Sequence, residues 1–161
     1  MPKSLQQQFL ESGGAPIRID DVIVVQMDSV QIPTAADVSV KFIGDSVYSD
    51  NAVILAIRKP GRIRMSDGSW VTAIEIWDEA NLPREVVYRV RSDGQPLMVH
   101  NKYRVRHSAG FVTEDNFTGN AAMVVTTISR NRKLYECSNG LGHFDKRDLV
   151  FELEWEKVPV S

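Results

Sequence analysis

One run of residues, 97–107, carries polar side chains whose spacing fits a binding site. Successive side chains of a β-strand point to opposite faces, so this run divides into two sets. One face carries an amide, a phenol and an imidazole among valines: Asn101, Tyr103 and His107. The other face carries basic or titratable side chains: His100, Lys102, Arg104 and Arg106. We expect water to cover the basic face, which turns the first set inward.

The preceding run, 85–91, alternates in the same way and turns Tyr88 inward while its arginines face solvent. Small β-barrels hold ligands in cavities lined by apolar groups with a few polar ones. We therefore predict a small apolar or aromatic ligand bound inside the fold, by Trp77, Tyr88, Asn101, Tyr103 and His107. The alternative is a filled core, with the tyrosine hydroxyls at its rim and His107 exposed at a strand end.

No catalytic residue is assigned by a motif, but Glu75 and His107 are the candidates for acid–base chemistry. If Glu75 faced a cavity, loss of water would raise its pKa and suit it to act as a general base beside His107. The alternative places Glu75 outside the fold, paired with an arginine.

The outward basic residues form a strip that phosphate or RNA could bind: Arg62, Arg64, Arg89, Arg91, Lys102, Arg104 and Arg106. Single-stranded bases also need aromatic side chains on the same face, and Tyr88 and Tyr103 fall on the opposite one. An acidic stripe of Glu152, Glu154 and Glu156 offers cross-strand ion pairs instead. Together with a formal charge of −2, this predicts no nucleic-acid partner.

We predict neither a metal nor a cofactor. The chain has three histidines, too few inward for a three-histidine zinc site, and His143 with Asp145 is interpreted as part of a turn. The one cysteine, Cys137, is expected to be a buried thiol, and a chain without a disulfide fits a reducing compartment. The first twelve residues lack the apolar core of a signal peptide, and no apolar run reaches the roughly 20 residues of a membrane span. The predicted location is the cytoplasm.

The elements that position these residues follow from the pattern along the chain. Residues 4–11 predict a short helix, capped by Ser4 and stopped by Gly13-Gly14, which docks on the body or plugs an open end. Residues 17–158 predict a β body of about nine to ten strands. The first are expected over 17–27, 38–43 and 47–57, with a turn at Gly44-Asp45, and the last over 149–158, where apolar residues alternate with glutamates. Expected hairpins pair 62–65 with 70–77, 85–91 with 97–107, and 121–129 with 133–137. We predict one all-β domain over 1–161 (helix and linker 1–14, β body 17–158), an antiparallel barrel or a two-sheet sandwich, with the barrel preferred.

The stretch from Gly142 to Trp155 resembles the last strands of the cone-shaped α+β barrels of polyketide cyclases and ketosteroid isomerases. Those folds begin with long helices, whereas residues 17–57 here are predicted to be strands, so the resemblance assigns no residue a role.

Two functions are therefore predicted. The first is a small-molecule-binding β-barrel, with isomerase or cyclase activity as a further expectation. The alternative is a non-enzymatic interaction module, of inhibitor or immunity type, that acts through an outer face or a sheet edge. An exposed edge also makes a homodimer reasonable.

Overall fold

The computed structural model describes residues 3–44 and 50–160. In that part of the chain one short helix precedes 14 strands, and the strand pairs are antiparallel. This confirms the predicted all-β class with an N-terminal helix. More strands are present than the nine to ten expected, because several are only two or three residues long. No helix among the described residues is long and apolar enough to cross a membrane.

The helix α1 (Leu5–Glu11) begins where the sequence predicted. The Ser4 hydroxyl accepts a hydrogen bond from the Gln7 backbone N–H at 3.2 Å, which satisfies one of the helix's free amides. Leu5 and Phe9, four residues apart, form its buried face. Because seven residues cannot make a stable helix in isolation, this packing holds α1 in place.

A five-stranded sheet carries the predicted site run. Its order is β11-β10-β5-β8, and β3 pairs with β10 on the same side as β11. Its strands are β3 (Asp28–Val30), β5 (Asn51–Ile57), β8 (Ala73–Trp77), β10 (Leu97–Arg106) and β11 (Val112–Asp115).

A seven-stranded sheet forms the other layer, in the order β12-β13-β14-β4-β9-β6-β7. Its strands are β4 (Ala35–Phe42), β6 (Arg62–Arg64), β7 (Trp70–Val71), β9 (Glu85–Arg91), β12 (Ala122–Ser129), β13 (Arg132–Ser138) and β14 (Leu149–Lys157). In β14 the predicted alternation is confirmed: Phe151, Leu153 and Trp155 are buried, whereas the glutamates between them are not.

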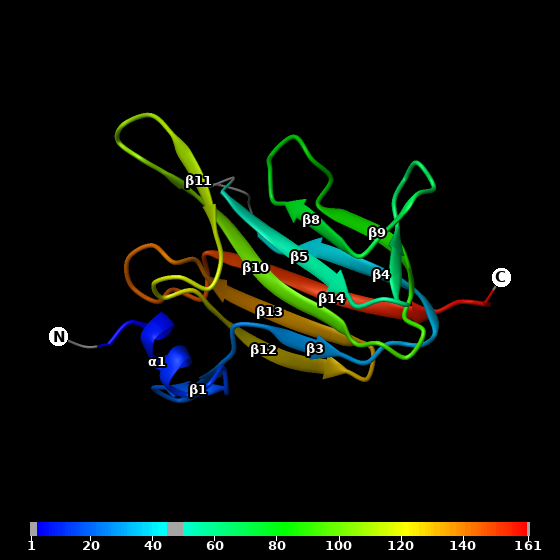
Figure 1. Ribbon diagram of the computed structural model, residues 1–161, viewed down its shortest axis with the longest axis horizontal. Helices are drawn as coiled ribbons and strands as arrows, with labels where there is room; N and C mark the ends of the chain where they lie inside the picture. The colour runs from blue at the N-terminus through cyan, green and yellow to red at the C-terminus, as the bar shows by residue number, and fades with distance from the viewer. Residues whose placement is uncertain (1–2, 45–49, 161) are drawn as a thin grey trace.

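The two sheets share one hydrophobic core, to which Leu55, Val99, Val40, Tyr135 and Leu153 contribute fully buried side chains. Figure 1 shows β5 and β10 passing across β13, β14 and β4. Among the described residues neither sheet order returns to its first strand, so strand pairing does not by itself close a barrel.

An acid–phenol–amine contact joins the two layers at one side of this core. The Tyr135 hydroxyl donates a hydrogen bond to Asp28 Oδ2 at 2.7 Å, and Lys133 Nζ lies 3.0 Å from the same oxygen. Asp28 belongs to β3, whereas Tyr135 and Lys133 belong to β13. The contact therefore ties the five-stranded sheet to the seven-stranded one.

The predicted strand over 17–27 is wrong as a single element. It folds into a hairpin of β1 (Ile17–Ile19) and β2 (Val22–Val24), with Asp20 at φ 51° in the turn. Aspartate tolerates this left-handed backbone better than most residues. The hairpin packs on α1 and β12 as a second, smaller core, with Leu5, Phe9, Val24 and Ala122 buried in it.

One predicted hairpin is confirmed in part and another is wrong. Residues 62–65 do pair with the start of 70–77, as β6 with β7, but the run is interrupted at Thr72, which leaves β7 in one sheet and β8 in the other. The runs 85–91 and 97–107 do not pair: β9 lies between β4 and β6, and β10 lies in the opposite sheet. The turn at 92–95 thus carries the chain from one layer to the other. The predicted hairpin of β12 and β13 is confirmed.

The Gly44-Asp45 turn and the start of the strand predicted over 47–57 lie partly outside the described residues. The described remainder of that strand is β5, whose residues are nearly all buried.

Candidate functional site

Asn101 and Tyr103 lie inside the fold, as predicted, but they contact protein rather than open space. The Asn101 side chain, 3% exposed, donates a hydrogen bond to the Ser138 carbonyl at 3.1 Å. The Tyr103 hydroxyl bonds to the Thr118 hydroxyl and lies against Gly140, where even an added Cβ would collide with it. Burial raises the pKa of Tyr103. Both side chains therefore have their polar groups satisfied by the core and the loops beside it.

Trp77 and Glu75 lie on the outer face of the five-stranded sheet. The Arg104 guanidinium stacks 3.8 Å from the centre of the Trp77 ring, and the indole N–H donates to Glu75 at 3.2 Å. Lys102 Nζ donates a hydrogen bond to Glu75 at 2.5 Å, and this bond is the main reason that the pKa of Glu75 is lowered. The hypothesis of a desolvated general base at Glu75 is therefore wrong, and the alternative of an outward, ion-paired carboxylate is correct, with lysine in place of arginine.

Tyr88 and His107 lie far from that pair in the topology. Tyr88, on β9 of the seven-stranded sheet, packs at the margin of the core, and burial raises its pKa. His107 follows β10, where its ring stacks on Phe111 at 4.2 Å and its Nε2 lies 2.9 Å from the Thr113 hydroxyl. The five predicted ligand-binding residues are thus divided among the core, the outer sheet face, the second sheet and a hairpin tip.

The prediction that water covers the basic face of β10 is wrong at His100. This side chain points away from the core, yet it is only 8% exposed, because the Phe117 ring lies over it at 4.8 Å. Its Nδ1 has no hydrogen-bond partner among the described residues. Loss of water, and to a lesser extent the charge of Lys102, lowers the pKa of His100 to about 4.

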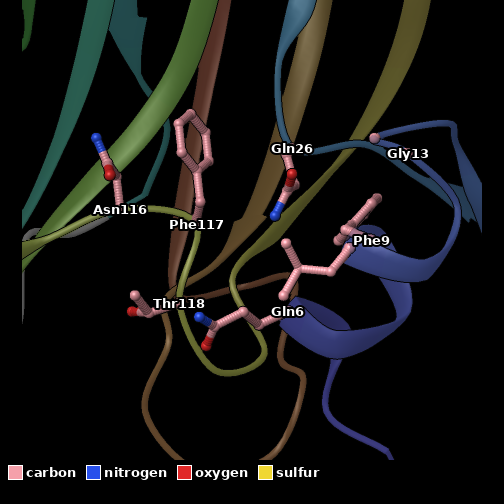
Figure 2. Close-up of a pocket in the computed structure, with 9 residues that line it drawn as sticks. Gln6, Phe9, Gly13, Gln26, Asn116, Phe117 and Thr118 are labelled. Carbon is pink, nitrogen blue, oxygen red and sulfur yellow. The ribbon is translucent and has the colours of Figure 1, made fainter.

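A pocket of about 380 Å³ opens next to Phe117, between α1 and the residues that follow β11. We call it the helix pocket. Figure 2 shows the loop residues on one side, α1 on the other and Gln26 between them. It is lined by Gln6, Phe9, Leu10, Gly13, Gly14, Gln26, Asn116, Phe117 and Thr118.

The two walls of the helix pocket are joined at one place. The Gln6 backbone N–H donates to the Gly119 carbonyl at 2.8 Å, and the Gly119 N–H donates to Gln6 Oε1 at 3.0 Å. The Leu5 N–H donates to the Asn120 side chain at 3.1 Å. Because these bonds satisfy amides of the first helical turn, the loop acts as a cap for α1. The helix that was predicted to dock on the body does so here.

The loop wall contains a strained residue. Phe117 has φ 58°, a left-handed conformation that is a clear outlier for a bulky side chain. Such a conformation costs of order 1–3 kcal/mol and clusters at functional sites. In this protein it directs the Phe117 ring over His100 and into the wall of the helix pocket.

The lining determines what the helix pocket can bind. None of its nine residues carries a charge, two are phenylalanines, and three carry amides. In the described part of the chain the side chains of Gln26 and Asn116 form no hydrogen bond, so their amide groups are available to a ligand. An uncharged molecule with an apolar ring and hydrogen-bonding groups matches this lining.

This site could not be predicted from the sequence because its walls come from separate segments. The only signal was the run of amide, aromatic and small residues at 116–120, next to a helix that was expected to dock.

The predicted basic strip is divided between the sheets, and its ion pairs have other partners than expected. Lys102 pairs with Glu75 and Glu114, and Arg104 pairs with Glu79. Arg89 pairs with Asp37, and Arg106 pairs with Asp50. Of the acidic stripe, Glu152 and Glu154 pair with Arg132 instead.

Cys137 is fully buried, and burial raises the pKa of its thiol, as expected for an inert side chain. Among residues 3–44 and 50–160 no three histidine, cysteine or acidic side chains gather in a way that could hold a metal ion.

Comparison of the chain with protein-family models, with curated proteins and with solved structures gives no match.

Proposed function

We propose that this chain is a small-molecule-binding protein whose ligand occupies the helix pocket. The ligand is uncharged, with an aromatic or apolar body and groups that exchange hydrogen bonds with carboxamides. The proposal keeps the predicted ligand class but moves the site from the interior to the pocket beside α1.

The single observation that supports it best is the pair of free amides beside two aromatic rings. Gln26 and Asn116 are half-buried and have no hydrogen-bond partner among the described residues, while Phe9 and Phe117 line the same space. Because no protein group occupies these amides, a ligand in the pocket can exchange hydrogen bonds with them. Uncharged lining residues offer no acid or base, so the proposal is for binding and does not extend to isomerisation or cyclisation.

Benzamide is a suitable probe because it combines a phenyl ring with one carboxamide. We expect it to bind in the millimolar range, as a fragment of nine heavy atoms should, with its ring between Phe9 and Phe117. Ligand-observed NMR and isothermal titration calorimetry both measure such binding.

The test is a matched pair of glutamine variants. Gln26→Ala removes one free amide and should weaken benzamide binding about threefold to tenfold, the effect of one neutral hydrogen bond. Gln7→Ala changes an exposed glutamine of α1 that does not line the pocket and should leave binding unchanged. Equal affinity in the two variants, or no binding of benzamide by the parent chain, would contradict the proposal.

A second candidate function, the predicted interaction module, is favoured by the hairpin of β10 and β11. It projects from the body (Figure 1), and its tip exposes Phe111 and Val112, at 54% and 47%. Apolar side chains exposed together are typical of protein contacts. Under this reading a Phe111→Ser variant abolishes binding to a partner protein and leaves benzamide affinity unchanged, which separates the two functions. For either function we retain the cytoplasm as the proposed location.

A further inference from the structure

Four arginines gather on the outer face of the seven-stranded sheet, where β6 pairs with β9. In the register of these strands Arg62 lies directly opposite Arg91. Arg64 and Arg89, two residues along each strand, share their face, because Ile63 and Val90 between them are fully buried in the core. Like charges opposite each other across strands are destabilising. The arrangement therefore implies a compensating negative charge.

The protein supplies only part of that charge. Arg89 has a close partner, with its Nε 2.6 Å from Asp37 Oδ1. Arg62 and Arg91 share Asp93 at 3.6 and 3.7 Å. Within the described residues the Arg64 side chain forms no ion pair or hydrogen bond, and Arg91 Nε is buried without a hydrogen-bond partner. Four guanidinium groups thus face two carboxylates, which leaves two positive charges on a chain whose net charge is −2.

The space around these arginines has two parts. A small hollow of about 50 Å³ is lined by Ala35, Arg64, Trp70, Arg89, Arg91 and Pro159. A cavity of about 370 Å³ beside it is lined by Arg64, Met65, Ser66, Val86, Val87, Tyr88 and Arg89. The two share Arg64 and Arg89, so we treat them as one site and call it the arginine groove. The larger part exists because β6 pairs only with Val90 and Arg91 and leaves the rest of the β9 edge open.

Aromatic side chains accompany the cations. Trp70 lies opposite Arg64 in the register of β6 and β7 and is 40% exposed. The Arg62 guanidinium lies over the Trp70 ring, 4.8 Å from its centre. Tyr88 lines the larger part of the groove. A flat organic group in the groove therefore has both cationic and aromatic neighbours.

We propose that the arginine groove binds a small phosphate ester with an aromatic or apolar body. The phosphate lies in the small hollow against Arg64 and Arg91, and the body lies in the larger part beside Tyr88. A phosphate monoester carries about −1.5 to −2 charges at neutral pH, which matches the two uncompensated guanidinium groups, and the guanidinium fork suits its oxygens.

A short ligand fits better than a nucleic acid because acidic residues bound the groove on one side. The neighbouring surface of the same sheet is lined by Asp37, Glu85, Glu154 and Glu156. These carboxylates would repel an extended chain of phosphates, whereas a single phosphate in the hollow does not reach past Asp37.

Phenyl phosphate, inorganic phosphate and phenol are the three probes, and calorimetry on the full chain is the assay. We expect phenyl phosphate to bind more tightly than inorganic phosphate, and phenol not to bind. Arg64→Gln should weaken phenyl phosphate binding about tenfold, the effect of one charge-assisted contact. Arg18→Gln removes the same charge from the exposed strand β1 and should have no effect.

Tyr88→Leu separates the two parts of the recognition, because Tyr88 lines the larger part of the groove and not the small hollow. It should weaken binding of phenyl phosphate and leave inorganic phosphate unchanged. The proposal fails if Arg64→Gln and Arg18→Gln have the same effect, or if inorganic phosphate binds as tightly as the ester. It also fails if phenyl phosphate gives no heat of binding at a concentration about 10-fold above a millimolar dissociation constant. It also fails if oligothymidylate binds more tightly as its length grows, because that result indicates a nucleic-acid surface. Benzamide binding is independent of all these outcomes.

Discussion

His100 provides a quantitative prediction about pH and stability. Its ring is buried beneath Phe117, and its pKa in the folded protein is about 4, against an ordinary value of 6.5. Between these two values the unfolded chain binds a proton that the folded chain does not. Stability must therefore fall as the pH is lowered through this window and become level below it.

The magnitude follows from the gap between the two pKa values. Each pH unit of such a gap corresponds to about 1.4 kcal/mol, so burial of neutral His100 makes the free energy of unfolding about 3 kcal/mol lower at pH 4 than at pH 7. Because the side chain is only 8% exposed, solvent screening reduces this figure little. Other groups titrate in the same window, so the contribution of His100 needs a difference measurement.

The perturbation is His100→Phe, which keeps an aromatic ring under Phe117 and removes the titration. Urea unfolding of both proteins at several pH values between 7 and 4 gives the difference in their stability. We expect this difference to move by about 3 kcal/mol in favour of the variant as the pH falls. An independent NMR titration should show that Phe117→Ala raises the pKa of His100 towards 6.5. A stability difference that does not change with pH, or an imidazole that titrates near 6.5 in the parent protein, would refute the reasoning.

Three further predictions concern buried residues of the core and the contacts at its margins. Asp28→Ala leaves the buried Tyr135 hydroxyl without its acceptor and should lower the free energy of unfolding by about 2–3 kcal/mol in urea titrations; an unchanged midpoint would mean that this contact does not join the sheets. Gly140→Ala places a methyl group against the Tyr103 hydroxyl and should cost about 1–3 kcal/mol or more, part of which Tyr103→Phe recovers in the double variant; absence of any recovery would show that the crowding lies elsewhere. Cys137 should react with an aromatic disulfide reagent only at the rate of unfolding, because its thiol is fully buried; rapid labelling of the native protein would argue against that burial.

The local sequence pattern was sufficient to predict those elements whose two faces differ strongly in polarity. In β14 apolar and acidic residues alternate strictly, so both the strand and its buried face followed from the sequence. The Ser4 cap and the two glycines after α1 likewise marked both ends of the helix. These features are local, and each is decided by a few neighbouring residues.

Pairing between strands could not be derived in this way. The turn at 92–95 has the composition of a hairpin, yet it connects β9 and β10 in different sheets. The choice depends on which distant strand covers each edge, and here β4 and β6 flank β9 while β5 flanks β10. The predicted ligand face assumed the wrong pairing, which is why its five residues do not converge.

The burial of His100 shows the same limit for a single residue. Its alternation with Val99 and Asn101 correctly placed it on the face away from the core, but that face is covered there by Phe117 from a loop. Residues that cover a sheet from a distant segment leave no periodic signal in the strand they cover. The helix pocket was missed for this reason, because its walls come from α1 and the glycines after it, from Gln26 and from the loop after β11.

Isotope-filtered NMR of the chain with benzamide gives the most direct evidence on the proposed binding site, because it reports which protein protons lie within a few ångströms of the probe. We expect intermolecular NOEs from the phenyl protons to the Leu10 methyl groups and to the rings of Phe9 and Phe117. NOEs to core methyl groups such as those of Leu55 and Val99 would instead place the ligand between the sheets and contradict the account.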